Sequence, residues 1–412
     1  MKQNSRLLLI FIAIALLPAI VFLQMKIDPR RAQFQPGKKG VGAFIIRDVN
    51  NSPIAMPAQL MAGALVGFRE VTAGLLWVRC DEFFDAGDYD AIVPLIRLIT
   101  WLDPHQVDVY DTGAWHLAYN FIDSGQHADY RYIQPAIALL KEGVSNNQGV
   151  SDIETCLGFD IYNQKALDYK NAAYWLLRAS KEKDSFFARD RLVAHAYEKN
   201  GEFDKAERQW LYCIASAQKV MDAHPNLANP YYIEASGHFE VSRRNLDEFR
   251  AHKIMYADLA KNRTDVGFEA TCKRLSSHVF EISGKANLPD GSRINVELCN
   301  RDYKEPEMKS FSWNINRDAT VLVDKGPLHG LFVEGGKFRH KYNLSRDIKQ
   351  YPFKQDQYVL KLTFNPREAP EGTRVQTGWS GEGLTDKKYL DTSIPGLRRI
   401  QKVIYLQRKD LI

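Results

Sequence analysis

The sequence predicts a multidomain chain, α then β, in which an N-terminal transmembrane helix precedes an α-helical solenoid and a C-terminal antiparallel β-sandwich. Three observations predict this order. An uncharged apolar run stands near the N-terminus, a helical pattern repeats in the middle of the chain, and alternation of apolar and polar residues follows it. The 412 residues, 45% of them hydrophobic, leave room for several separate cores.

Charge and cysteine content argue against several functions. The net charge of +5 is small for this length, and no basic run is interleaved with aromatic residues, so we expect no nucleic-acid binding. The five cysteines include no C-x-x-C pair, which argues against a disulfide framework or a structural zinc site. Only Cys272 and Cys299 are candidates for a single bridge.

The N-terminal segment 1–26 is predicted to anchor the chain in a membrane. Leu7–Met25 contains no charged residue and is just long enough to cross the hydrocarbon core, and Lys2 and Arg6 precede it. The bulky residues that follow are untypical of a cleavage site, although cleavage near Ala19 is the alternative. We therefore expect a single-pass protein of the bacterial inner membrane.

Residues 27–56 are predicted to be a linker, because proline and glycine recur along them. Their basic residues outnumber the two before the span, which by the positive-inside rule favours a cytoplasmic body, but long domains translocate regardless of such charges. The orientation stays open, with a slight preference for an extracytoplasmic body. Arg69 and Glu70 interrupt the next apolar run, so we expect no second span.

Residues 57–266 are predicted to form a domain of helical repeats. Four positions recur 34 residues further along the chain: Tyr169, Ala172, Leu176 and Ala179 return as Phe203, Ala206, Trp210 and Cys213. Such a period is typical of stacked helical units, which bury their apolar faces only against their neighbours. Between two of the helices, Gly201 suits a helix C-terminus that needs a left-handed backbone.

This region resembles the tetratricopeptide repeat family. Besides the recurring positions, the matches are Leu157-Gly158, Tyr162, Ala194, Tyr197 and Gly201, and an earlier unit contains Gly87, Tyr89 and Asp103-Pro104. Two further units match weakly, one at 110–143 with a lengthened turn and one at 225–260 as another helical pair. An irregular helical solenoid is the alternative.

The resemblance implies that the first helix of each pair lines a concave groove that binds a protein partner. By register, the outward-facing residues on those helices are Asp81, Asp85, Gln164, Lys165, Arg191, His195, Glu198 and Lys199. The alternative is that each is an ordinary solvated charge. Their mixed signs argue against a dedicated clamp for a carboxylate and favour a folded or extended protein segment as the ligand.

Residues 270–412 are predicted to form the β-sandwich. Alternating runs around Phe280 and Val296 flank the turn at 287–291 and predict a hairpin. Further strands are expected at 319–323, 331–333, 338–342, 358–364 and 403–406, with no helix among them. In rhythm alone, the pattern resembles an immunoglobulin-like or transthyretin-like domain.

No catalytic, metal or cofactor motif is complete. The glycine-rich loop Gly378–Gly383 has a glutamate where a nucleophile elbow needs its second glycine, and it lacks the third glycine of a dinucleotide fingerprint. His195 with Glu198, and His116 with Asn120, share helical faces but have no second set of ligands nearby. We therefore expect no enzyme activity, no cofactor and no bound metal.

These features favour a non-enzymatic, membrane-anchored adaptor or scaffold of the bacterial envelope that binds a protein through the concave face of the repeats. The alternative is a constitutive structural subunit of a membrane or envelope complex. Exposure of Trp101, Trp115 or Trp175 would favour that alternative.

Overall fold

The computed structural model describes residues 46–47, 53–54, 68–326 and 329–412. The predicted membrane span, at residues 7–25, lies outside this part of the chain. Among the described residues, no helix is both long and apolar enough to cross a membrane.

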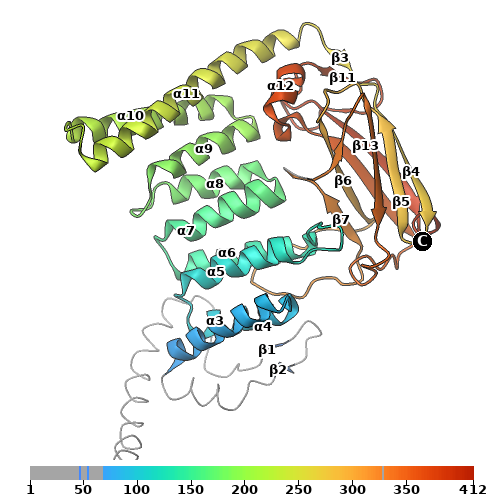
Figure 1. Ribbon diagram of the computed structural model, residues 1–412, viewed down its shortest axis with the longest axis horizontal. Helices are drawn as coiled ribbons and strands as arrows, with labels where there is room; N and C mark the ends of the chain where they lie inside the picture. Colours follow the sequence, from blue (N-terminus) through green and yellow to red (C-terminus); the bar gives the residue numbers. More distant parts are fainter. Residues whose placement is uncertain (1–45, 48–52, 55–67, 327–328) are drawn as a thin grey trace, which may run out of the picture. The chain divides into compact units, whose positions relative to one another are not determined.

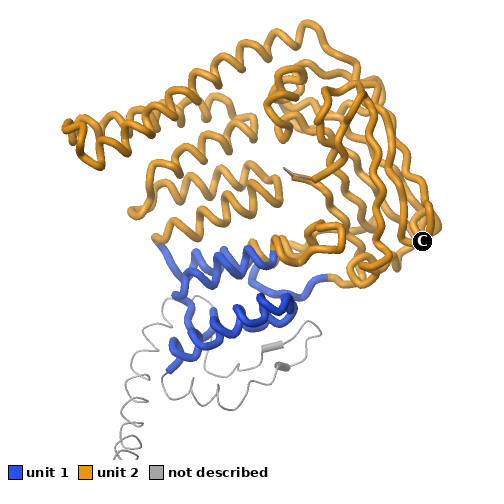
Figure 2. Tube along the Cα trace, in the orientation of Figure 1, with its two compact units in different colours: residues 1–117, 138–148, 308–315 blue, residues 118–137, 149–307, 316–412 orange. Residues whose placement is uncertain are grey.

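Apart from two short strands at 46–47 and 53–54, helices come first along the described chain and mainly antiparallel strands follow, as predicted (Figure 1). The chain divides into two compact units, which Figure 2 colours separately. Unit 1 comprises residues 1–117, 138–148 and 308–315, and unit 2 comprises residues 118–137, 149–307 and 316–412.

Unit 1 is mainly helical. Its elements are the paired strands β1 (Ile46–Arg47) and β2 (Pro53–Ile54), the helices α3 (Arg69–Asp85), α4 (Tyr89–Leu102) and α5 (Val107–Trp115), and the later part of α6 (Ile133–Asn146). Helix α4 buries Ile92, Ile96 and Ile99, whose spacing places them on one face. It ends just before Asp103-Pro104, as predicted, although Pro94 lies inside the same helix.

The helices of unit 2 pack in chain order. They are α7 (Ser151–Thr155), which runs on into the π-helical segment η3 (Cys156–Ala166), α8 (Tyr169–Ala179), α9 (Phe187–Asn200), α10 (Phe203–Ala223) and α11 (Pro230–Leu259). Each of α8, α9 and α10 contacts the next helix along the chain. Seven of the eight recurring positions are buried, and Phe203 is half-buried, so the recurring pattern marks the core between these helices.

The end of α9 follows the prediction for its glycine. Gly201 caps the helix in the left-handed region with a φ of 77°, and its N–H donates to Glu198 O. A Cβ at this position would also collide with the Arg367 guanidinium of the β-domain.

Replacing Gly201 by alanine is expected to lower the free energy of unfolding by about 1–3 kcal/mol, because a residue with a Cβ is strained in this conformation. Gly237→Ala is the matched control. Gly237 lies inside α11 and a Cβ there meets nothing within 4 Å, so this change should be neutral or stabilising by up to about 1 kcal/mol. Chemical denaturation followed by circular dichroism measures both, and equal midpoints for the two variants would contradict the expectation.

The predicted helical pair at 225–260 is wrong, because α11 is one continuous helix. Asn229 caps its start by accepting from Tyr231 N at 2.9 Å, and Pro230 stands at the first helical position. Between there and Leu259, no proline follows and a lone glycine does not break a helix that packs along α10.

The β-domain of unit 2 consists mainly of two antiparallel sheets. One follows the order β12 (Leu390–Asp391), β13 (Arg399–Gln407), β10 (Gln357–Phe364), β6 (Arg293–Asn300), β7 (Val321–Asp324), with β8 (Leu331–Phe332) also paired to β6. The other consists of β4 (Glu269–Ser276), β5 (Val279–Lys285) and β9 (Lys337–Asn343). Side chains from both sheets, such as Phe280 and Leu360, share one core.

The predicted hairpin around the turn at 287–291 is wrong. β5 pairs with β4 and β9, whereas β6 pairs with β10, β7 and β8, so the turn carries the chain from one sheet to the other. Cys272 on β4 and Cys299 on β6 are both free, and burial raises the pKa of these thiols to about 12 and about 11.

The β-region also contains elements that were not predicted. The expectation of no helix there is wrong, because α12 (Glu371–Thr377) and the 3-10 turns η4 (Pro366–Glu368) and η5 (Arg408–Asp410) lie in it. Two short parallel strands, β3 (Thr264–Asp265) and β11 (Leu384–Thr385), pair where α11 passes into the β-domain.

A loop at residues 121–129 fastens the helical part of unit 2 to its β-domain. It precedes the 3-10 turn η2 (Tyr130–Tyr132), and its end overlaps the lengthened turn that the sequence predicts at 127–132. Tyr351 Oη donates to Asp123 Oδ2 at 2.9 Å, and Asp123 Oδ2 also lies 2.9 Å from His127 Nδ1. His127 Nε2 faces Asp324, at the end of β7, at 3.7 Å.

Candidate functional site

The candidate site is a groove in unit 2 between the helices and the β-domain. Two cavities, of about 290 and about 270 Å³, share Asn163, Lys199 and Arg374 in their walls. The two cavities therefore adjoin each other, and we call the pair the inner groove; its two parts differ in chemistry. We call the first part the aromatic cavity and the second part the basic cavity.

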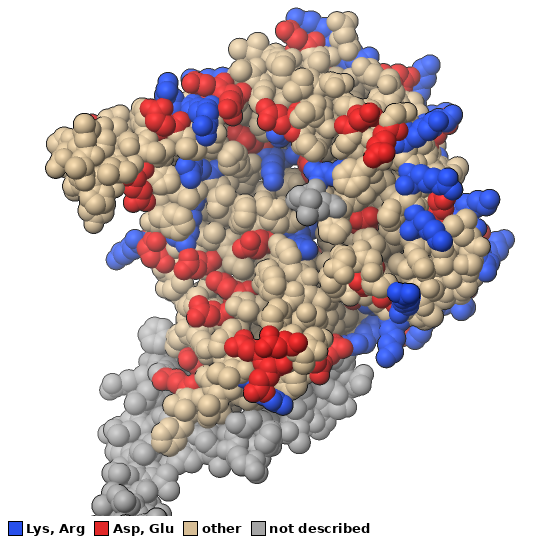
Figure 3. Space-filling view, viewed as in Figure 1, with Lys and Arg blue, Asp and Glu red and all other residues tan. Residues whose placement is uncertain are grey.

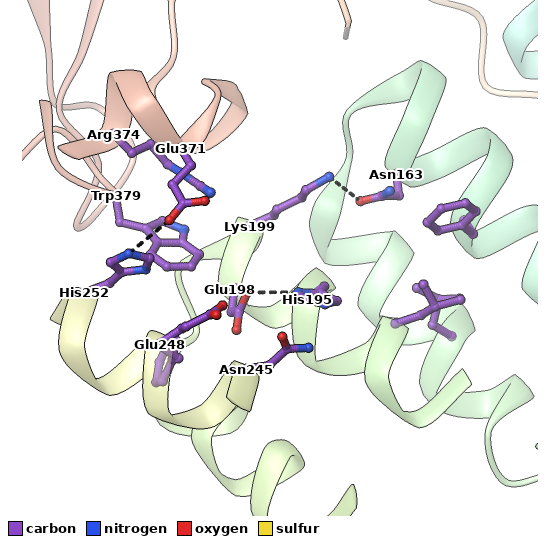
Figure 4. Close-up of a pocket in the computed structure, with 14 residues that line it drawn as sticks. Asn163, His195, Glu198, Lys199, Asn245, Glu248, His252, Glu371, Arg374 and Trp379 are labelled. Atoms are coloured by element: carbon purple, nitrogen blue, oxygen red, sulfur yellow. Dashed lines mark hydrogen bonds and ion pairs between the residues drawn. The ribbon is translucent and has the colours of Figure 1, made fainter. Parts of the chain in front are cut away.

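The aromatic cavity combines apolar rings with side-chain amides and the carboxylates of Glu198, Glu248 and Glu371. Phe249 of α11 and Trp379, which follows α12, are both buried, and their ring centres lie 6.0 Å apart. Phe159 of η3 adds a third ring to the wall, and the amides of Asn163 and Asn245 also face the space (Figure 4). Apolar surface beside amide groups suits an extended peptide, which needs both packing and backbone hydrogen bonds.

Lys199 stands where the two cavities meet. It lies in the last turn of α9, two residues before the left-handed cap at Gly201. Nζ donates to Asn163 Oδ1 at 3.4 Å and lies 5.4 Å from the Tyr169 ring centre. Burial lowers the pKa of Lys199, and the charge of Arg374 lowers it further. Lys199 is thus a partly buried ammonium group in the groove wall.

Glu198 and His195, which the sequence assigns to the partner-binding face, have other principal contacts. Glu198 is 5% exposed, and its Oε1 accepts a 2.6 Å hydrogen bond from Trp210 Nε1. His195 Nδ1 lies 3.1 Å from Glu198 Oε2, and its ring meets the Trp210 ring edge to face. Both residues line the aromatic cavity (Figure 4), but Glu198 is held by the helical core and only His195 is exposed.

The remaining predicted residues separate into three groups. Gln164 lines the basic cavity. Lys165 and Arg191 line neither cavity, and Lys165 Nζ lies 3.9 Å from the Tyr119 ring centre, with its pKa lowered to about 8 by burial. Asp81 and Asp85 are exposed on α3, which belongs to unit 1. The groove of unit 2 therefore includes Gln164, His195, Glu198 and Lys199 from the predicted set.

The β-domain supplies groove residues that the sequence does not indicate. Arg293 of β6, Arg367 of η4 and Arg374 of α12 all line the basic cavity. They come from strands and turns far along the chain from the repeats, and no motif links them to the helices. Basic side chains are visible in the hollow between the helices and the strands of unit 2 (Figure 3).

Arg367 also joins the two walls of the groove. Its guanidinium donates to Asn200 O at 2.8 Å, to Ser380 Oγ at 3.0 Å and to Gly396 O at 3.2 Å. The first of these bonds connects the β-domain to the last residue of α9. Arg367 therefore fixes the spacing between the helices and the β-domain at the basic cavity.

Nothing in the described part of the chain forms a metal site, since no group of three or more His, Cys, Asp or Glu side chains there is placed to hold an ion. The glycine-rich loop predicted to lack catalytic function lies after α12 and positions Trp379. Neither protein-family models nor curated proteins give a match to this chain.

Proposed function

We propose that this chain is a non-enzymatic, membrane-anchored adaptor that binds an extended segment of a partner protein in the inner groove. The groove itself carries the proposal: rings and amides line one of its two adjoining cavities, and both the helices and the β-domain contribute to its walls. Phe249, Trp379 and Asn245 supply the packing surface and hydrogen-bonding group that a peptide would use.

The β-domain has a definite part in this proposal. It covers one side of the helices, so that a partner segment contacts both layers rather than an open concave face. The buried indole of Trp379 packs against Phe249 and Phe203, and its Nε1 has no hydrogen-bond partner among the described residues. A buried donor without a partner is costly, so binding that moves the indole and brings a carbonyl to it would be favoured.

The membrane anchor at residues 7–25 remains part of the proposal, as does the tetratricopeptide-like character of the helices. Together they would hold the groove near a membrane surface and keep the captured partner there. The alternative of an obligate structural subunit has support from one residue. Trp115 is 42% exposed, whereas Trp101 and Trp175 are half-buried beneath Arg69 and Arg178.

A photo-crosslinking residue at position 245 of the full-length chain tests the groove assignment. Asn245 faces the aromatic cavity, whereas Asp247, two residues along α11, is exposed and does not line it. We expect position 245 to give a defined adduct with one partner in the source cells, and position 247 to give none. The same adducts from both positions, or none from position 245, would contradict the proposal.

Filling the groove gives a second measurement. Asn245→Trp places a large ring in the aromatic cavity and should reduce co-purification of the crosslinked partner about tenfold, equivalent to about 1.4 kcal/mol of binding free energy. Asp247→Trp should leave the yield unchanged.

A further inference from the structure

The basic cavity has four cationic groups and a single carboxylate, Glu368, in its lining. Lys199, Arg293, Arg367 and Arg374 line a cavity of about 270 Å³. Among the described residues, none of these four forms an ion pair. Partly buried charges without partners are destabilising, because burial removes water that would otherwise solvate them.

The single carboxylate in this cavity is held by amides rather than by a cation. Glu368 Oε2 accepts from Asn295 Nδ2 and Oε1 from Asn365 Nδ2, both at 2.6 Å. Burial raises the pKa of Glu368, which favours its neutral form. The hydrogen bonds from the two amides and the charge of Lys325 act in the opposite direction, so the Glu368 carboxyl group is satisfied mainly by neutral donors.

The arginines are oriented by neutral acceptors. Arg293 donates to Gly326 O at 2.7 Å and to Glu368 O at 3.1 Å, both of them backbone carbonyls. A carbonyl satisfies an N–H group but leaves the positive charge in place. Burial lowers the pKa of Arg293, as it does for Lys199, so the environment disfavours both cations as the cavity stands.

Arg374 has one donor that the protein leaves without a hydrogen-bond partner among the described residues. This donor is its buried Nε, and its guanidinium carbon lies 4.7 Å from the Trp379 ring centre. Asn163 and Gln164 line the same space and add amide groups. A planar guanidinium, an ammonium and nearby amides are the groups that bind an oxyanion.

We infer that the basic cavity is an oxyanion site, formed jointly by the helices and the β-domain, which takes a carboxylate or phosphate group. The inference rests on the proposed function in one respect: because the two cavities adjoin, a segment bound in the aromatic cavity would place an acidic residue in the basic cavity. A free inorganic anion has the same chemistry and is the other source. In both cases, the bound group bridges Lys199 of α9 to Arg374 of α12 and holds the two walls together.

Isothermal titration calorimetry of the purified full-length chain tests this site with three probes: inorganic phosphate, a glutamate-rich peptide with an amidated C-terminus, and a glutamine-rich peptide of equal length. We expect the acidic peptide or phosphate, or both, to bind, with affinity falling as salt is raised. The glutamine-rich peptide should bind more weakly than the acidic one. Binding of phosphate alone assigns the site to a free anion, and binding of the acidic peptide alone assigns it to a partner.

The variant Lys199→Gln with Arg374→Gln should weaken this binding at least about tenfold. Its control, Lys219→Gln with Arg244→Gln, removes two exposed charges from α10 and α11 outside the groove and should change affinity less than about twofold. Circular dichroism verifies that each variant folds. If the double variant does not fold, the single variant Lys199→Arg is used instead, and it should retain binding because it keeps the positive charge. Failure of both anionic probes to bind, or equal binding by the two double variants, would overturn the inference. A crosslink from position 245 without anion binding would overturn the oxyanion site alone.

Discussion

Replacing Trp210 by alanine is expected to lower the free energy of unfolding by about 3–5 kcal/mol. Trp210 is fully buried on α10 and lies in the cluster that joins α9, α10 and α11. Two losses add up. Removing the ring leaves an unfilled space in the core, and the buried Glu198 carboxylate loses the 2.6 Å hydrogen bond from the indole Nε1.

Trp210→Phe separates these losses, because phenylalanine keeps most of the apolar volume and removes the donor. It should cost about 2 kcal/mol, the range for a hydrogen bond to a charged group. Tyr212→Ala is the matched control on the same helix. Tyr212 is 55% exposed, so this change should cost less than about 0.5 kcal/mol. Guanidinium denaturation followed at the helical circular-dichroism band measures all three, and a wild-type midpoint for Trp210→Phe would show that Glu198 does not depend on the indole.

The role of Glu198 shows where prediction from the sequence reaches its limit within the helices. The recurring positions identify the buried faces correctly, because apolar spacing and small residues follow directly from the helical period. Polar residues between them are read as solvent-facing by default. A carboxylate that is buried under an indole leaves no periodic signal, since its partner Trp210 is assigned to the core on size alone.

Strand positions and strand partners are predictable to different degrees. Alternation of apolar residues locates β10 and β9 to within a few residues of their observed ends, because each strand buries one face locally. Pairing between strands depends on contacts across long sequence separations, which alternation does not encode. The expected hairpin between β5 and β6 failed for this reason, although both strands exist.

The basic cavity could not be predicted, for a related reason. The mixed charges on the helices alone argued against a site for an anion. The structure adds Arg293 and Arg374 from the β-domain to Lys199 from α9, so the local charge balance depends on the packing of one layer against the other. The net charge of a groove can therefore be predicted only when the residues of both its walls are known.

The loop at residues 121–129 leads to a second prediction with a large effect, because a buried histidine lies between two carboxylates. His127 Nδ1 is 2.9 Å from Asp123 Oδ2, and His127 Nε2 is 3.7 Å from Asp324 Oδ2. Asp324 also accepts hydrogen bonds from Tyr342 Oη at 2.6 Å and Gly330 N at 2.7 Å. The other titratable groups around His127 are Asp347, Tyr351, His329 and His340.

The directions of the pKa shifts define the pH window of this stabilisation. Burial alone would lower the pKa of His127, but the hydrogen bond and charge of Asp123, with the charge of Asp324, raise it above 6.5. Its contribution is therefore complete below pH 6.5 and is lost as the pH rises through the raised value. Burial opposes ionisation of Asp324, yet its hydrogen bonds and the charge of His127 lower its pKa to about 2. Its contribution to stability is therefore present above pH 3.8 and is lost as the pH falls toward about 2.

Replacing His127 by glutamine should therefore lower the free energy of unfolding most between about pH 4 and pH 6.5, by about 3–5 kcal/mol, because Asp123 and Asp324 are left buried without a cation. Above the raised histidine pKa, the wild-type chain also lacks that cation, so the gap between the two should shrink. Melting temperatures of both chains across pH 4 to 9 measure this gap, with the exposed His105→Gln as the matched control for removing one histidine. A gap that stays constant with pH would show that His127 stabilises the loop by packing alone, and it would leave the fastening of the β-domain to the helices independent of pH.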